Sequence, residues 1–242
     1  WQMAFMAMGG GSALSLLMAW VLLKPKPMAV RGRLLQVPDY RPAVKNRAVM
    51  GYVLAYFFHN WELIAVRSWL VTYLAYTAAR TGDTPLLAAA MVAAITNMLG
   101  LPSSVIGNEL SMRFGRRRVV TILQWSSAIV AVTVAIAAEA PYLVVLALAF
   151  LHGITVTSDS ASVTAGAVGA APSELRGITM AAHSVIGFVG SILGPLVFGI
   201  MLDVGGGPDS TAGWQLAFVS LGAAIAAGPI CLRLLNRGGR GE

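Results

Sequence analysis

The chain has 242 residues, of which 57% are hydrophobic and only 11% are charged, and its mean hydropathy is +0.74. A soluble domain is about 25% charged, so this composition excludes an ordinary soluble domain and indicates a polytopic membrane protein. The formal net charge of +7 could suggest nucleic acid binding, but the basic residues fall between apolar runs. They are topology signals there, and no nucleic acid partner is expected. The single cysteine, Cys231, excludes an intramolecular disulfide and a cysteine metal cluster.

The sequence predicts seven membrane-spanning helices. A helix needs about 20 mainly apolar residues to cross the hydrocarbon layer of a lipid bilayer. Seven runs meet this requirement, and segments rich in Pro, Gly or charge separate them: Trp1–Leu23, Ala48–Thr77, Leu86–Ile106, Val119–Ala138, Tyr142–Gly166, Ile178–Leu202 and Trp214–Leu235. The expected fold is therefore an all-α bundle in the membrane.

The basic residues lie almost entirely in one set of gaps between the spans. Of the 17 Lys and Arg residues, only Arg67 and Arg80 lie elsewhere. Because Lys and Arg accumulate in cytoplasmic loops, this bias predicts a cytoplasmic C-terminus and places Trp1 on the outer face. Residues 24–47 are then a basic cytoplasmic linker, and residues 236–242 a cytoplasmic tail.

The start of the chain has two notable features. It begins with Trp1 and lacks the basic n-region of a signal peptide, so the chain is expected to be a fragment. The segment Trp1-Gln-Met-Ala-Phe5 recurs as Trp214-Gln-Leu-Ala-Phe218. Both copies open a span, and the two spans are six crossings apart, as a parallel six-helix repeat requires. A Trp at the mouth of a span is also a common interfacial anchor.

The second span carries an unusual set of polar residues. At 100° per residue they share an arc of about 160° on one helical face: Tyr52, Tyr56, His59, Asn60, Glu62 and Arg67. Ionisable groups inside a span usually face a bundle interior or a water-filled cavity, so this face is interpreted as a pathway for substrate or a coupling proton. His59 and Glu62, at i and i+3, can hydrogen-bond each other. Arg67 could hold an anionic substrate or neutralise Glu62, and a purely structural polar network is the alternative.

A basic segment separates the third and fourth spans. Residues 108–118 contain four arginines, Arg113, Arg116, Arg117 and Arg118. They are expected to form a short loop in which Gly115 allows a tight turn.

The run 110–117 within this segment is similar to the loop signature of the major facilitator superfamily, roughly G-x-L-x-D-R-x-G-R-R. It departs from that signature at Asn108, where the family has Gly, and at Met112, where the family has Asp. In that family the loop joins the second and third helices of each six-helix half.

The resemblance extends over the whole chain. The seven spans resemble helix 6 and helices 7 to 12 of the family, so residues 1–23 would belong to the N-terminal half and residues 48–235 would form the C-terminal half. Residues 173–177 (Ser-Glu-Leu-Arg-Gly) are also similar to the family pattern after helix 10. The resemblance implies a secondary active transporter, a permease or symporter that moves a small molecule by alternating access. Protons, the missing N-terminal half and the bilayer are its implied partners, and no cofactor is implied. The Ala- and Gly-rich composition suggests a bacterial inner membrane.

The resemblance also implies a cytoplasmic gate. Its candidate residues are Arg113, Gly115, Arg116, Arg117, Asp159, Glu174 and Arg176. Asp159 lies about 25 Å along the fifth span from Tyr142 at 1.5 Å per residue, near the cytoplasmic edge, and is expected to pair with Arg113 or Arg116. His152, nearer the middle of that span, is either a pathway residue or a packing histidine.

The sixth span contains small residues at helical spacing. Gly187, Gly190 and Gly194 would permit close contact with a neighbouring helix, and Pro195 would permit a kink.

No catalytic motif occurs, so an enzyme and a metal site are not expected. A membrane-embedded metal site made of His59, Glu62, His152 and Asp159 was considered, but no two of these residues have a convincing ligand spacing on one helix. A seven-helix receptor or sensor without transport remains the alternative to a transporter, because seven spans with the N-terminus outside also match receptor topology.

Overall fold

The computed structural model describes residues 2–24 and 39–236, which belong to two compact units. The first unit contains helix α1 (Gln2–Leu22). Within it, the hydroxyls of Ser12 and Ser15 donate to the carbonyls of Met8 and Gly11, so these polar groups are satisfied inside the helix. Most of the predicted linker, residues 25–38, and the tail residues 237–242 lie outside the described part of the chain.

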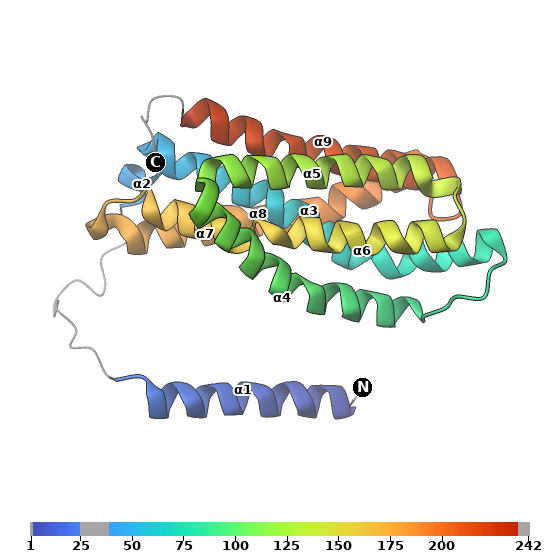
Figure 1. Ribbon diagram of the computed structural model, residues 1–242, viewed down its shortest axis with the longest axis horizontal. Helices are drawn as coiled ribbons and strands as arrows, with labels where there is room; N and C mark the ends of the chain where they lie inside the picture. Colours follow the sequence, from blue (N-terminus) through green and yellow to red (C-terminus); the bar gives the residue numbers. More distant parts are fainter. Residues whose placement is uncertain (1, 25–38, 237–242) are drawn as a thin grey trace. The chain divides into compact units, whose positions relative to one another are not determined.

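The second unit is a bundle of helices (Figure 1). Its elements are α2 (Arg41–Lys45), α3 (Arg47–Thr81), α4 (Ala89–Phe114), α5 (Arg116–Ile136), η1 (Ala137–Glu139), α6 (Tyr142–Ser158), α7 (Ser160–Gly169), η2 (Ser173–Leu175), α8 (Arg176–Val204) and α9 (Thr211–Leu235). The long helix α3 packs against α8 and α9, α5 runs beside α9, and α4 packs against α6. Including α1, the described residues contain seven segments long and apolar enough to span a membrane, which confirms the predicted all-α polytopic fold.

Two helices extend beyond the apolar runs that predicted them. Helix α3 has 35 residues and is about 52 Å long at 1.5 Å per residue. It begins where the Asn46 side chain accepts hydrogen bonds from two backbone N–H groups, and it ends at Gly82 with φ +69°. Helix α4 continues to Phe114, well past the predicted end at Ile106. The hydrocarbon thickness limits an apolar run, whereas a helix can continue into water with polar residues.

The predicted fifth span is interrupted. Instead of one helix over 142–166, α6 ends at Ser158 and α7 begins at Ser160, with Asp159 between them. The hydroxyls of Thr157 and Ser158 donate to the carbonyls of Gly153 and Ile154, one turn back. Such back-bonding weakens and bends a helix, which accounts for a break at this position.

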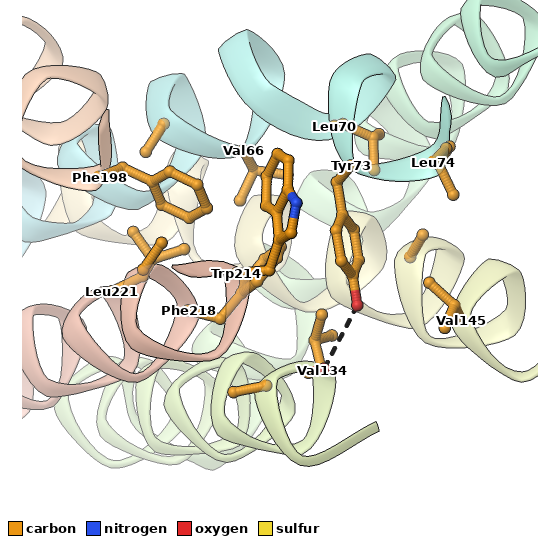
Figure 2. Packing of buried hydrophobic residues seen from close by; sticks show 14 of the residues in the cluster. Val66, Leu70, Tyr73, Leu74, Val134, Val145, Phe198, Trp214, Phe218 and Leu221 are labelled. Atoms are coloured by element: carbon orange, nitrogen blue, oxygen red, sulfur yellow. Dashed lines mark hydrogen bonds between the residues drawn. The ribbon is translucent and has the colours of Figure 1, made fainter. Parts of the chain in front are cut away.

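An aromatic cluster forms the core of the bundle (Figure 2). Trp214 is fully buried, and its indole N–H donates to the Pro208 carbonyl at 2.8 Å. Tyr73 packs against it with ring centroids 5.0 Å apart, and Phe218 meets Phe198 edge-on at 5.1 Å. Both aromatic residues of the second Trp-Gln repeat therefore serve as core residues, and the interfacial-anchor interpretation of Trp214 is wrong.

The outer surface of the bundle is strongly apolar. Met98 and Leu101 on α4, Ile129 on α5 and Ile192 on α8 are among many large side chains that are more than half exposed. A soluble protein rarely exposes so much contiguous apolar surface, whereas lipid tails accept it.

Candidate functional site

Two carboxylate–histidine pairs link α3 to the α6–α7 segment. His59 Nδ1 lies 2.7 Å from Asp159 Oδ1, and His152 Nε2 lies 2.7 Å from Glu62 Oε1. All four side chains are buried. His59 and Glu62 therefore share a face of α3 but do not hydrogen-bond each other. Each reaches across to α6 or to the break that follows it.

Helix α5 supplies further partners to both carboxylates. The Gln124 amide donates to Asp159 Oδ2 at 2.8 Å and to the Ala55 carbonyl at 3.0 Å. The Ser127 hydroxyl donates to Glu62 Oε1 at 2.8 Å. Each carboxylate thus has one histidine and one neutral donor, which compensates in part for its removal from water. Sequence reasoning missed both α5 residues, although a Gln and a Ser at spacing three in an apolar span were the available signal.

Two other predicted pathway residues of α3 contact their own helix or α8. The Tyr56 ring stacks on the imidazole of His183 with centroids 3.8 Å apart. His183 Nε2 in turn lies 3.3 Å from the Thr164 hydroxyl. The Asn60 amide donates to the Tyr56 carbonyl one turn back. These side chains form a polar contact among α3, α7 and α8. It adjoins the His59–Asp159 pair, because the Tyr56 ring also stacks on the His59 imidazole with centroids 5.9 Å apart.

Tyr52 lies nearer the start of α3, in a small buried cluster with Ala55, Val163 and Leu232. A Cβ added at Gly166 would overlap the Tyr52 ring, so a glycine is needed on the α7 side of this contact.

Arg67 is the exception among the predicted residues of this face, because its side chain is exposed. It lines a small cleft between α3, α4 and α6, together with Asn97, Gly153 and Thr157. It does not pair with Glu62, whose bonds go to His152 and Ser127. The expectation that Arg67 neutralises Glu62 is therefore wrong.

The basic segment is a turn of one residue and not a loop. Gly115, with φ +90°, is the only residue between α4 and α5, so Arg113 lies in α4 and Arg116 begins α5. The Arg116 guanidinium donates to Asn108 Oδ1 at 2.9 Å and to the Ser162 carbonyl at 3.2 Å. The predicted pairing of Asp159 with Arg113 or Arg116 is wrong, because the Asp159 oxygens are bonded by His59 and Gln124.

The other candidate gate residues lie near this turn or at the start of α8. Arg117 donates to the carbonyls of Asn236 and Arg233, and so caps the C-terminal end of α9. Glu174 lies in η2, where it accepts a hydrogen bond from Ser173. Arg176 begins α8 and lines an open groove with hydroxyl side chains of α4 and α7. Over residues 39–236, no ion pair joins Glu174 to an arginine of the turn.

The glycines of α8 lie where this helix meets α3. A Cβ at Gly190 would overlap the carbonyl oxygen of Phe57, and one at Gly194 would overlap that of Trp61. Gly187 lies against the Tyr56 ring in the same way. Pro195 lies inside α8, and its carbonyl accepts a hydrogen bond from the Trp69 indole. The α3–α8 contact thus brings two backbones within a distance that only glycine permits.

The structure is an all-α membrane bundle with ionisable groups paired in its interior. The described residues contain no group of three or more His, Cys, Asp or Glu side chains that could hold a metal ion. The model of the Major Facilitator Superfamily matches residues 74–241. The chain belongs to this family and is a membrane transporter of the major facilitator kind, which favours the transporter over the receptor alternative. Searches of curated proteins and of solved structures gave no significant match.

Proposed function

We propose that this chain is part of a secondary active transporter that moves a small solute by alternating access and couples that movement to protons. The observation that carries the proposal is the burial of two carboxylate–histidine pairs between α3 and the α6–α7 segment. Ionisable groups at membrane depth are costly and usually mark a pathway or a proton relay.

Each pair can act as a proton-binding unit. With a neutral imidazole, a pair such as Glu62–His152 carries one negative charge, and one added proton makes it neutral overall. Burying a net charge costs far more free energy than burying a neutral, hydrogen-bonded pair. Proton binding therefore changes the relative free energies of a conformation that hydrates the pair and one that buries it, which is what coupling requires.

The architecture also supports alternating access. Residues 48–235 supply six spans, and the recurrence of Trp-Gln-x-Ala-Phe at spans six crossings apart supports a two-half carrier with α1 in the other half. The distribution of Lys and Arg supports a cytoplasmic C-terminus, and we place the protein in a bacterial inner membrane on composition. On this topology the Gly115 turn is cytoplasmic. Arg113, exposed at the end of α4, is then available to a partner across the gate, whereas Arg116 and Arg117 stabilise this half.

Uptake by the full-length protein in proteoliposomes, with and without an inward proton gradient, tests the coupling. The informative variant is Glu62→Gln, which keeps the shape and an acceptor for Ser127 but removes the charge. We expect gradient-driven uptake to be lost while substrate binding and energetically downhill exchange persist.

The matched control is Tyr142→Phe, which deletes a buried hydroxyl that has no hydrogen-bond partner among the described residues. This variant should transport like the unaltered protein. Gradient-driven uptake that survives Glu62→Gln would assign Glu62 to a structural network. The absence of uptake of any compound by well-folded protein would overturn the transport proposal itself.

A further inference from the structure

Arg67 occupies an unusual position for a charged residue. It lies 20 residues after the start and 14 before the end of α3, which places it about 30 and 21 Å from the two ends of the helix. It is flanked along the helix face by Leu63, Val66 and Leu70, which line the same cleft. A guanidinium stays protonated in proteins, so this is a permanent positive charge in the apolar part of a spanning helix.

No acidic side chain of the described bundle neutralises Arg67. Glu62, the nearest carboxylate along the chain, is bonded by His152 and Ser127, and Asp159 is bonded by His59 and Gln124. Residues 39–236 provide Arg67 with no ion pair of its own. An uncompensated charge at this depth is costly. Because the Arg67 side chain is exposed on the described bundle, a negatively charged group from outside this part of the chain can reach it and offset that cost.

The cleft beside Arg67 offers the features of a small anion site. The cleft is partly open and has a volume of about 20 Å³, so it holds about one water molecule. Asn97 on α4 is exposed at the cleft and adds an amide. The hydroxyls of Thr96 and Thr157 donate to backbone carbonyls of their own helices, so their protons are already used. Arg67 and Asn97 therefore supply the N–H donors of the cleft side chains, and Leu70 is among the apolar residues that line the rest.

We propose that Arg67 and Asn97 form the subsite that binds the carboxylate of the transported substrate, which is then a small organic anion with an apolar body. This inference rests on the transport function proposed above. A planar guanidinium matches a carboxylate with two parallel hydrogen bonds. One arginine balances the single charge of a carboxylate, whereas a phosphate dianion would leave one charge uncompensated.

Binding of matched ligands to the purified full-length protein tests the subsite. The probes are the monocarboxylates acetate and benzoate, their carboxamides and the corresponding primary amines. Binding is followed by ligand-induced thermal stabilisation and transport by counterflow in proteoliposomes. At least one carboxylate should bind at least 10-fold more tightly than its carboxamide. Arg67→Gln should abolish this preference, Asn97→Ala should reduce it, and Arg67→Lys should keep part of it.

The control is Arg80→Gln, which removes another arginine of α3. Arg80 lies near the end of α3 and donates to the Ala140 carbonyl, so the ligand preference of this variant should be unchanged.

A preference for carboxylates that survives Arg67→Gln would overturn the subsite and assign Arg67 to an acidic residue elsewhere in the protein. Transport of carboxamides or amines without a preference for carboxylates would overturn the subsite while leaving the transporter proposal intact. If Arg67→Gln does not fold, Arg67→Lys and Asn97→Ala decide the same question. No binding or transport of any compound would overturn both.

Discussion

The Glu62–His152 pair makes a quantitative prediction about stability that bears on function. Replacing either residue alone by leucine leaves its partner buried without a counterpart. Glu62 would keep only the hydrogen bond from Ser127, and His152 Nε2 would keep none that the described residues offer. Breaking a buried pair in this way costs about 3–5 kcal/mol. For a protein of this size, a loss of that magnitude lowers Tm by roughly 6–20 °C.

Replacing both residues by leucine should cost much less than the sum of the two single changes. The double variant loses the 2.7 Å contact, but it also removes the need to bury a carboxylate and an imidazole. Apolar residues of similar volume often replace a buried pair with little or no loss. We therefore expect the double variant within about 2 kcal/mol of the unaltered protein, with a coupling free energy of about 3 kcal/mol or more.

Thermal unfolding of the four proteins in detergent, followed by tryptophan fluorescence, measures this cycle. A control cycle on Ser111 and Ser162, whose hydroxyls are 2.8 Å apart and buried, should give a coupling of only about 0.6 kcal/mol, as neutral pairs in membrane proteins do. Strictly additive losses at Glu62 and His152 would refute the claim that the two side chains stabilise each other. A stable double variant that does not couple transport to protons would show that the pair serves function at no benefit to folding.

Two further changes test other parts of the structure. Gly190→Ala should destabilise the bundle by about 1–3 kcal/mol, because the added carbon overlaps the Phe57 carbonyl. The control is Gly177→Ala on the same helix, where the added carbon meets open space, and it should be neutral or stabilise by up to about 1 kcal/mol. Equal changes in Tm for the two variants would contradict the close approach of α3 and α8. If the exposed Arg113 side chain belongs to the gate, Arg113→Gln should lower the transport rate more than it lowers the affinity for substrate. Equal losses of transport rate and of substrate affinity would count against that role.

The sequence predicted the spans well because hydrocarbon thickness acts directly on composition. Seven apolar runs had to be long enough to cross the membrane, and each overlaps one of the seven described segments that are long and apolar enough to do so. The predicted helix boundaries are wrong where the helical backbone does not follow the apolar composition. The third predicted span ended at Ile106 because Asn108 and Glu109 are polar, yet the backbone continues as a helix to Phe114. The break at Asp159 depends on local hydroxyl bonds, which a hydropathy pattern does not register.

The pairing within the site could not be predicted for a different reason. Helical periodicity tells which residues share a face, and it correctly grouped His59 with Glu62 on the interior side of α3. It does not tell which helix that face meets or in which register. Their partners, Asp159 and His152, lie about 90 or more residues further along the chain. Only the packing of α3 against α6 and α7 brings them into contact.

The placement of charge on α6 indicates how the two proposed sites could communicate. His152 and Asp159 point into the buried network, while Gly153 and Thr157, on the same stretch of α6, line the cleft beside Arg67. The two carboxylate–histidine pairs and the lining of the cleft thus meet on neighbouring faces of one short helical segment. Because this segment ends at a break, loss of a proton from the His59–Asp159 pair would leave a net buried charge and favour an arrangement that hydrates the pair. α6 would then be free to shift against α3, and the wall of the cleft would move with it. Coupling in this scheme needs no direct contact between proton and substrate. It needs only that both sites favour the same position of α6.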